Sequence, residues 1–238
     1  MTASASGTCA QNCTFLQSSF TTQVLKVGTT ASGVAGFKST AVARWAVGQT
    51  QSRWTINFKA PTVTNPVQIT NMAPQIRCDN AVPGYAIAGC VIPQVIVGLN
   101  YVGGWGGFQS HVVGAQKSGL PGGSAARPIH RSVNAALQVK NRDKACPKTL
   151  KRPPGLTCDE YPFASAKEGA FTGGGSARTQ PGCQVPFPGK PSTGAIGYSY
   201  CMINEAVNSQ AGTAMNSKLF IPFRVLDGDG FYVSFSAS

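Results

Sequence analysis

The sequence predicts an α+β fold in which a β-rich N-terminal region precedes a mixed region and disulfides cross-link the chain. The 238 residues include 28 Gly and 16 Pro, which makes the chain rich in turns and excludes a coiled coil or a helical repeat. Hydrophobic residues make up 42%, enough for a buried core and too many for general disorder. Strand-like alternation dominates the first part, whereas helix-like stretches occur in the second.

Residues 1–91 are predicted to form a small antiparallel β region that packs on the rest of the protein. Thr22–Val27 and Trp54–Lys59 alternate apolar with polar residues in the manner of half-buried strands. The region contains no His and a single acid, Asp79, so it offers no cluster of residues that suggests chemistry.

Residues 92–238 are predicted to mix strands and helices. The apolar run Val95–Leu99 favours a buried strand over residues 91–102, and the Gly-rich turn after it favours a helix start. The remaining elements expected are helices over 108–118, 131–145 and 203–219, a Pro-rich loop over 181–191, and a strand pair over 221–235. Asp227–Gly230 is expected to be a hairpin turn, because it is too short for a calcium loop.

The eight cysteines fall into close sequential pairs, which suits local disulfides in an oxidising compartment. The expected pairs are Cys9 with Cys13, Cys78 with Cys90, Cys146 with Cys158, and Cys183 with Cys201. Free thiols or a metal site are the alternatives, but the spacing lacks the CxxC pairs of zinc sites. Residues 1–7 lack the charged start and apolar run of a signal peptide, so we expect a leader or an upstream domain to have preceded them.

The charge balance favours a polyanionic partner. Lys and Arg number 20 against eight Asp and Glu, a net charge of +12. Nucleic acid, an anionic membrane and an acidic polysaccharide would all be attracted, whereas the plain alternative is solubility alone. Six basic residues crowd positions 140–152, where phosphate contacts are expected. No stretch approaches the roughly 20 apolar residues of a membrane helix, so no membrane association is expected.

Asp and Glu residues are so few in this chain that each can be considered as a candidate site residue. Asp159 and Glu160 directly follow Cys158, and two adjacent carboxylates in a basic, partly buried site need a cation or an Arg to neutralise them. A metal site or a general base meets that description, and so does an ordinary surface turn. The only histidines, His111 and His130, are more simply interpreted as packed or surface residues than as catalytic ones, because the sequence contains no nucleophile elbow.

Several separated segments, in order, resemble the NucA/NucB-type extracellular deoxyribonucleases. The most specific is Cys158–Ser165, which is very similar to the family motif CDEYPFAS. The others are Ser110-His111 with Ala115, Asn141-Arg142 before Cys146, Lys167–Ala170, Ala177–Thr179, Asn208–Gly212, and Arg224–Asp229 followed by Phe231–Val233. The resemblance covers residues 92–238, and the segments around Cys78 and Cys90 resemble the region that precedes the domain in longer members. The chain departs from the common pattern at Ala166, at Ala170 and at Ser209, where Arg is common after the Asn; these positions lie outside the proposed ligands.

The resemblance implies a ββα-metal nuclease core that uses an acid where related nucleases use His. It implies that Asp159 is the general base, that Glu160 and Glu168 orient the site or hold metal-bound water, and that Asn208 is a metal ligand, with Glu168 as a second. Substrate contacts are expected from basic and amide side chains, namely Arg142, Lys167, Arg178 and Gln210. The cofactor is expected to be Mg²⁺ or Mn²⁺.

The resulting prediction is a secreted, metal-dependent, non-specific DNA endonuclease, monomeric and bound to DNA through the phosphate backbone. One alternative is the nuclease warhead of a delivered antibacterial toxin, which would have an inhibitor or immunity protein as partner. The other is a catalytically silent DNA-binding protein on the same scaffold.

Overall fold

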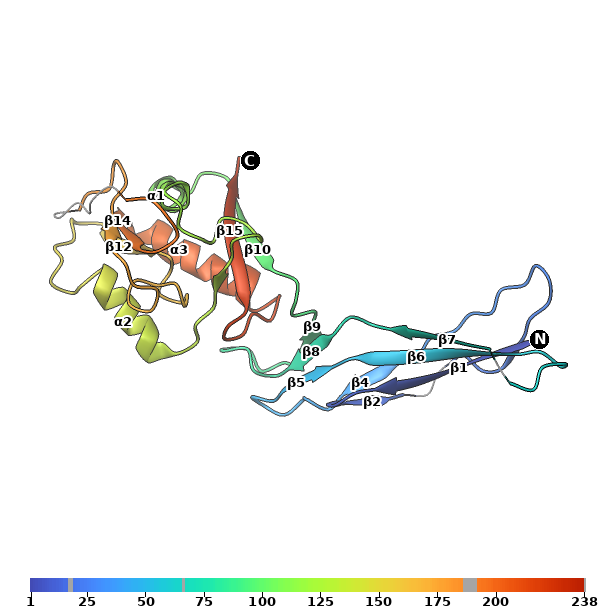
Figure 1. The fold of residues 1–238 in the computed structure, drawn as a ribbon. Coiled ribbons are helices and arrows are strands. Elements are labelled where there is room, and N and C mark those ends of the chain that lie inside the picture. The colour runs from blue at the N-terminus through green and yellow to red at the C-terminus, as the bar shows by residue number, and fades with distance from the viewer. Residues whose placement is uncertain (17–18, 66, 186–191, 238) are drawn as a thin grey trace. The chain divides into compact units, whose positions relative to one another are not determined.

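The computed structural model describes residues 1–16, 19–65, 67–185 and 192–237, and the chain divides into two compact units, Met1–Gln94 and Val95–Ser238. Figure 1 shows the first unit in blue to teal and the second in green to red. Residues 186–191 of the expected Pro-rich loop lie outside the described residues. The packing of the first region on the second stays a prediction.

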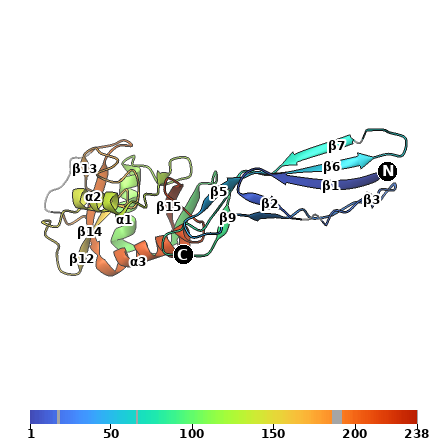
Figure 2. The same ribbon diagram turned by 90° about the horizontal axis from the view of Figure 1, so that it is seen from below.

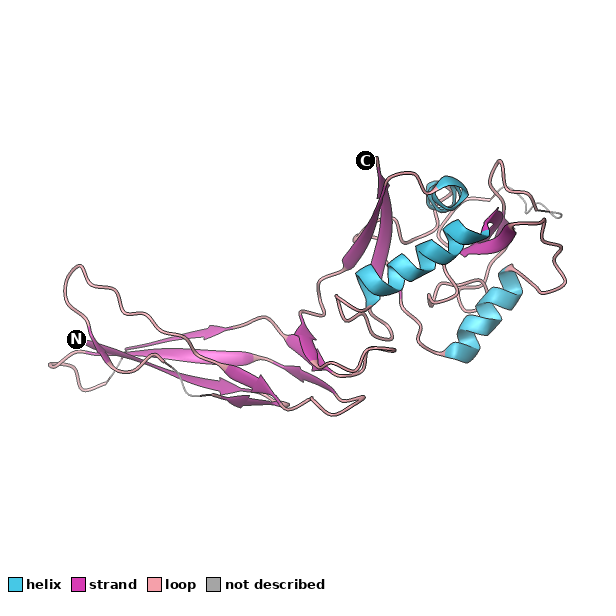
Figure 3. Cartoon of the chain, turned by 180° about the vertical axis from the view of Figure 1, so that it is seen from behind, coloured by secondary structure: helices cyan, strands magenta, loops and turns pink. Residues whose placement is uncertain are grey.

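The first unit is built from antiparallel strands, as the alternation predicted. β1 pairs with β6 over its whole length, with Ala3 opposite Phe58 and Cys9 opposite Ser52. The described residues of this unit form sheets with the orders β3-β1-β6-β7, β2-β4 and β5-β8-β9. Their strands are β1 (Thr2–Cys9), β2 (Cys13–Phe15), β3 (Gln23–Val24), β4 (Phe37–Ser39), β5 (Val47–Thr50), β6 (Ser52–Lys59), β7 (Val67–Met72), β8 (Ile76–Asp79) and β9 (Gly89–Val91). In Figure 3 every helix that is drawn belongs to the second unit.

A three-stranded sheet joins the two ends of the second unit. β10 (Val97–Val102) runs parallel to β15 (Gly230–Ser236), with Leu99 opposite Val233, and β11 (Ile129–His130) is antiparallel to β15. The inward side chains of this sheet, such as Phe231 and Val233, are fully buried.

The prediction of a strand pair over residues 221–235 is wrong. Only β15 forms there, and its partners are the distant strands β10 and β11. The backbone before it turns repeatedly, with a positive φ of 49° at Arg224 and 84° at Gly228, and a left-handed residue interrupts an extended strand. The segment Asp227–Gly230 is a turn that leads into β15, but no strand precedes the turn to complete the expected hairpin, and β15 pairs with β10 and β11 instead.

A second three-stranded sheet is the scaffold on which the helices pack. β14 (Tyr198–Asn204) lies at its centre, antiparallel to β12 (Leu156–Tyr161) and parallel to β13 (Ala177–Arg178). Alternate β14 residues enter different cores: Ile203 packs with Phe108 and Val112, whereas Met202 packs in a smaller cluster around the Cys146–Cys158 region. Both faces of β14 are therefore buried, with helices against them (Figure 2).

Among the described residues of the unit, three helices and one π-helical segment pack with these sheets. These are α1 (Gly106–Lys117), α2 (Ala135–Ala145), α3 (Glu205–Met215) and η1 (Asn216–Phe220). The predicted helices at 108–118 and 203–219 are confirmed within a few residues. The helix predicted over 131–145 begins later, because Asn134 is its N-cap and accepts a hydrogen bond from the amide of Leu137. Asn204 caps α3 in the same way through the amide of Val207.

All four expected cysteine pairs are confirmed as disulfides, Cys9–Cys13, Cys78–Cys90, Cys146–Cys158 and Cys183–Cys201. The bond between Cys146 and Cys158 ties the end of α2 to the middle of β12. Within the described ranges, no helix has the length and apolar character needed to cross a bilayer.

Candidate active site

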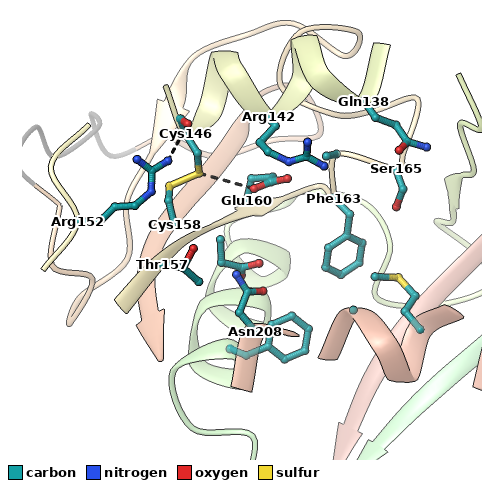
Figure 4. A pocket seen from close by; sticks show the side chains of 15 residues that line it. Gln138, Arg142, Cys146, Arg152, Thr157, Cys158, Glu160, Phe163, Ser165 and Asn208 are labelled. Atoms are coloured by element: carbon teal, nitrogen blue, oxygen red, sulfur yellow. Dashed lines mark hydrogen bonds between the residues drawn. A yellow bond between two sulfur atoms is a disulfide. The ribbon is translucent and has the colours of Figure 1, made fainter. Parts of the chain in front are cut away.

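A pocket of about 330 Å³ opens where β12 meets α1, α2 and α3. Figure 4 shows Glu160 near its centre, with Arg142 and the Cys146–Cys158 disulfide on one side and Asn208 on the other. The pocket is lined by Phe108, Gln138, Arg142, Cys146, Arg152, Thr157, Cys158, Asp159, Glu160, Phe163, Ala164, Ser165, Asn208, Gly212 and Met215. Three of the predicted site residues, Asp159, Glu160 and Asn208, therefore share one cavity with the predicted phosphate contact Arg142.

The carboxylate of Asp159 is held from behind by α1. Its Oδ2 lies 2.6 Å from Nδ1 of His111, whose Nε2 lies 2.9 Å from Oγ of Ser199. Asp159 is 5% exposed, His111 1% and Ser199 0%, so this hydrogen-bonded set is buried below the pocket wall. Within the part of the chain that is described, Oδ1 of Asp159 has no hydrogen-bond partner, which leaves it as the oxygen that can accept from solvent in the pocket.

Glu160 is directed towards α2. Its Oε2 lies 3.6 Å from Sγ of Cys146, a contact rather than a hydrogen bond because a disulfide sulfur carries no hydrogen. Burial, and next the charge of Asp159, raise the pKa of Glu160 to about 7, while Arg142 and the backbone amide of Ala164 act in the opposite direction. The basic neighbour therefore only partly offsets the cost of placing two carboxylates side by side.

Helix α3 presents Asn208 to the pocket. Asn208, Gly212 and Met215 are spaced by four and three residues, so they lie along one face of the helix. Tyr101 fixes the helix against the core, because its hydroxyl donates a 2.9 Å hydrogen bond to the carbonyl of Ala211. Asn204 at the helix N-cap fixes where the helix begins, and thus where Asn208 lies.

The oxygen donors of this pocket fit a hard divalent cation. Two carboxylates and an amide, from Asp159, Glu160 and Asn208, are the ligand types that Mg²⁺ and Mn²⁺ prefer. The described residues contain no group of three or more His, Cys, Asp and Glu side chains that could hold a metal, so a soft-metal cage of the zinc type is not formed by them. A cation at this pocket would keep several waters, as Mg²⁺ usually does.

The family of this region is decided by comparison with known families. Residues 122–234 match the family described as Deoxyribonuclease NucA/NucB. This part of the chain belongs to the NucA/NucB family. The chain has no match among curated proteins and none among solved structures. Most of the pocket wall, including Asp159, Glu160 and Asn208, lies within the NucA/NucB region, whereas Phe108, which also lines the pocket, precedes it on α1, as does His111 behind the wall.

Glu168, predicted to orient the site and to serve as a metal ligand, lies outside this pocket lining. Its carboxylate accepts from the backbone amide of His130 at 2.8 Å and pairs with Nδ1 of that residue at 2.6 Å. The neighbouring Lys167, a predicted substrate contact, forms an ion pair with Asp227 at 3.0 Å. In the NucA/NucB region these residues brace loops beside β11, and the structure does not bring them to Asp159.

Arg178, another predicted substrate contact, is 2% exposed and serves as an internal brace. Its guanidinium donates to both the carbonyl and the hydroxyl of Ser118 and to the carbonyls of Gly194 and Ile196, at 2.6 to 3.0 Å. Buried and engaged in this way, its guanidinium has little free surface with which to reach a phosphate, and the predicted phosphate contact stays a prediction. Gln210 is exposed on α3 and does not line the pocket.

Sequence reasoning missed the buried partners of Asp159. The sequence favours a packed or surface role for His111, and it gives no signal for Ser199, because a single Ser in an apolar strand has no distinctive spacing. Asn141 has a similar hidden role: it is fully buried and its side chain bonds to the backbone of Ala164, Ala166, Phe171 and Thr172. It thereby clamps the loop that follows β12.

Proposed function

We propose that the NucA/NucB region is a secreted endonuclease that hydrolyses DNA phosphodiester bonds with the help of a divalent cation. The observation that carries the proposal is the meeting of Asp159, Glu160 and Asn208 in one pocket beside Arg142, within residues that match a deoxyribonuclease family. The order of β12, β14 and α3, two antiparallel strands followed directly by a helix, supports a ββα-metal core.

Asp159 is the proposed general base. Its Oδ2 is engaged by His111, so Oδ1 takes the proton from a water that attacks the phosphorus. A general base must lie within hydrogen-bond reach of the water whose proton it takes, and Asp159 lines the pocket that such a water would enter. A carboxylate is suited to this role because in its ionised form it only accepts hydrogen bonds and can therefore take up a proton.

Asn208 and Glu160 are the proposed holders of the cation, and Arg142 and Arg152 are the proposed contacts of the phosphate. When bound, the cation stabilises the negative charge that builds up on the phosphate and on the leaving 3′-oxygen. Arg142 adds a second positive charge at the rim of the pocket, where it is exposed and can meet a phosphate without being uncovered first.

The net charge of +12 supports a nucleic-acid substrate that the protein contacts through the phosphate backbone. Contacts to phosphate carry no sequence information, so we expect little sequence preference and a steep loss of binding as salt rises. The four disulfides support action in an oxidising compartment outside the cell.

Nicking of supercoiled plasmid by the purified protein tests the proposal. Cleavage is expected with Mg²⁺ or Mn²⁺ and none with a chelator in excess. Asn208→Ala should raise the cation concentration needed for half-maximal cleavage, whereas Gln210→Ala, on the same helix but outside the pocket, should not. Salt-sensitive DNA binding without cleavage in any cation would instead support the catalytically silent alternative.

A further inference from the structure

We infer that His111 is a positioning residue, which holds the carboxylate of Asp159 so that a single oxygen faces the pocket. The inference rests on the proposed function, since it gives a role to a residue behind the proposed base. His111 lies on α1, before the residues that match the family, and no sequence motif assigns it a task.

The location of His111 is unusual for a polar side chain. It occupies the buried face of α1 together with Phe108, Val112 and Ala115, and its own side chain has 0% exposure. A polar group in such a core costs free energy unless its hydrogen bonds are satisfied. Both ring nitrogens are bonded, to Asp159 at 2.6 Å and to Ser199 at 2.9 Å, so the ring is held at two points.

The proton positions follow from the partners. An ionised carboxylate only accepts hydrogen bonds, so Nδ1 of His111 donates to Oδ2 of Asp159. In a neutral ring Nε2 is then an acceptor, and the hydroxyl of Ser199 donates to it. A one-way series of hydrogen bonds therefore runs from Ser199 on β14, through His111 on α1, to Asp159 on β12.

Ser199, His111 and Asp159 are the residue types of a Ser-His-Asp catalytic triad, but here the Ser does not act as a nucleophile. The nucleophilic Ser of a triad must face the substrate. Ser199 is 0% exposed and does not line the pocket, so its hydroxyl cannot attack a substrate there. The residue that does reach the pocket is Asp159, at the opposite end of the series.

The hydrogen bond from the His111 ring, which is itself held at both nitrogens, restricts how the Asp159 side chain can turn. A carboxylate without the Nδ1–H donor could rotate either oxygen towards the pocket and could tilt away from an attacking water. Because misplacement of a reacting group by about 1 Å can cost about a hundredfold in rate, removal of the imidazole is expected to lower kcat without weakening DNA binding.

Kinetics of four variants, with the intact protein and Mg²⁺, test the inference. His111→Ala should lower kcat about a hundredfold and leave KM close to its wild-type value. His111→Asn should keep most of the kcat, because the Asn amide group can donate from nearly the position of Nδ1. Val112→Ala, a truncation at an equally buried neighbour, should lower the melting temperature but not kcat. Ser199→Ala keeps the Nδ1 bond and should retain more kcat than His111→Ala.

Equal kcat for His111→Ala and Val112→Ala would overturn the inference, and so would failure of His111→Asn to recover activity. A readout independent of cleavage is the ¹H–¹⁵N spectrum of histidine-labelled protein, in which His111 should carry its proton on Nδ1 and none on Nε2. The opposite tautomer would overturn it as well. If the wild type cuts no DNA while the spectrum shows the expected tautomer, the proposed function fails and the placement of His111 stands.

Discussion

Asp159 and Glu160 are consecutive on β12 and therefore face opposite sides of the strand, Asp159 towards His111 on α1 and Glu160 towards Cys146 at the end of α2. Both nevertheless line the same pocket. The two carboxylates therefore have different surroundings. Asp159 is held by a hydrogen-bond donor, whereas burial and the charge of Asp159 raise the pKa of Glu160, which Arg142 offsets only in part.

Glu160 should make the cation-free protein less stable as pH rises. Its pKa in the folded state is about 7, above the ordinary value of 4.5, so the folded state binds the proton more tightly than the unfolded state. The stability it supports is fully present below about pH 4.5 and is lost as pH rises through about 7. Glu160→Gln does not titrate, so its melting temperature in chelator should fall less than the wild-type value between about pH 5 and pH 8. Parallel curves for the two proteins would contradict the raised pKa.

Arg142 should contribute one phosphate contact. Arg142→Gln is expected to weaken DNA binding similarly for unrelated sequences and to make the dependence of log affinity on log salt shallower by about one. Lys144→Gln is the matched control, because it removes an exposed positive charge from the same helix outside the pocket lining. Binding in chelator by fluorescence anisotropy, across a salt series, provides the measurement. An equal change in slope for both variants would assign the effect to net charge.

Arg178 should matter for folding and little for binding. Arg178→Met leaves the acceptors of Ser118, Gly194 and Ile196 without their donor, so the free energy of unfolding is expected to fall by about 2 kcal/mol or more. Denaturant unfolding measures the loss, and the salt dependence of DNA binding should be unchanged. If the variant were as stable as the wild type and its DNA binding depended less steeply on salt, the result would support the phosphate contact that the family resemblance implies for Arg178.

Glu168 should behave as a loop brace. Glu168→Gln weakens the two contacts to His130, one of which involves a half-exposed pair, so stability is expected to fall by about 1 kcal/mol or less. The cation concentration for half-maximal nicking should stay at the wild-type value, in contrast to Asn208→Ala. If Glu168→Gln needed a higher cation concentration for half-maximal nicking, the result would support the predicted role of Glu168 as a metal ligand.

Local patterns predicted much of this fold. The helices near 108–118 and 203–219, the strand around Trp54–Lys59 and the four disulfides follow from periodicity, turn residues and cysteine spacing, which all act over short stretches of chain. The parallel pairing of β10 with β15 did not follow, because Leu99 and Val233 meet only in the folded chain. The alternation of buried and more exposed residues along β10 and β15 indicates which face of each strand is buried, but it does not indicate which strand is the partner.

The residues of the site also differ in whether short stretches of sequence predict them. Asp159 and Glu160 stand out because acids are rare in this chain and follow a cysteine, and the family motif marks them. The burial of Arg178 and the bracing of Glu168 could not be predicted, because a basic or acidic residue in a loop has the same appearance in sequence whether it faces solvent or backbone carbonyls. The contact of His111 with Asp159 spans 48 positions and that with Ser199 spans 88, so only the tertiary fold brings them together.

Single-turnover cleavage by Asp159→Asn tests the central claim most directly. The amide can still accept the hydrogen bond from His111, so the fold and DNA binding should persist, but it cannot take a proton from water. We predict a fall in the cleavage rate of about 10²- to 10⁴-fold at saturating Mg²⁺ with an unchanged dissociation constant for DNA. Cleavage at the wild-type rate would show that Asp159 is not the base, and the account of this pocket would be wrong.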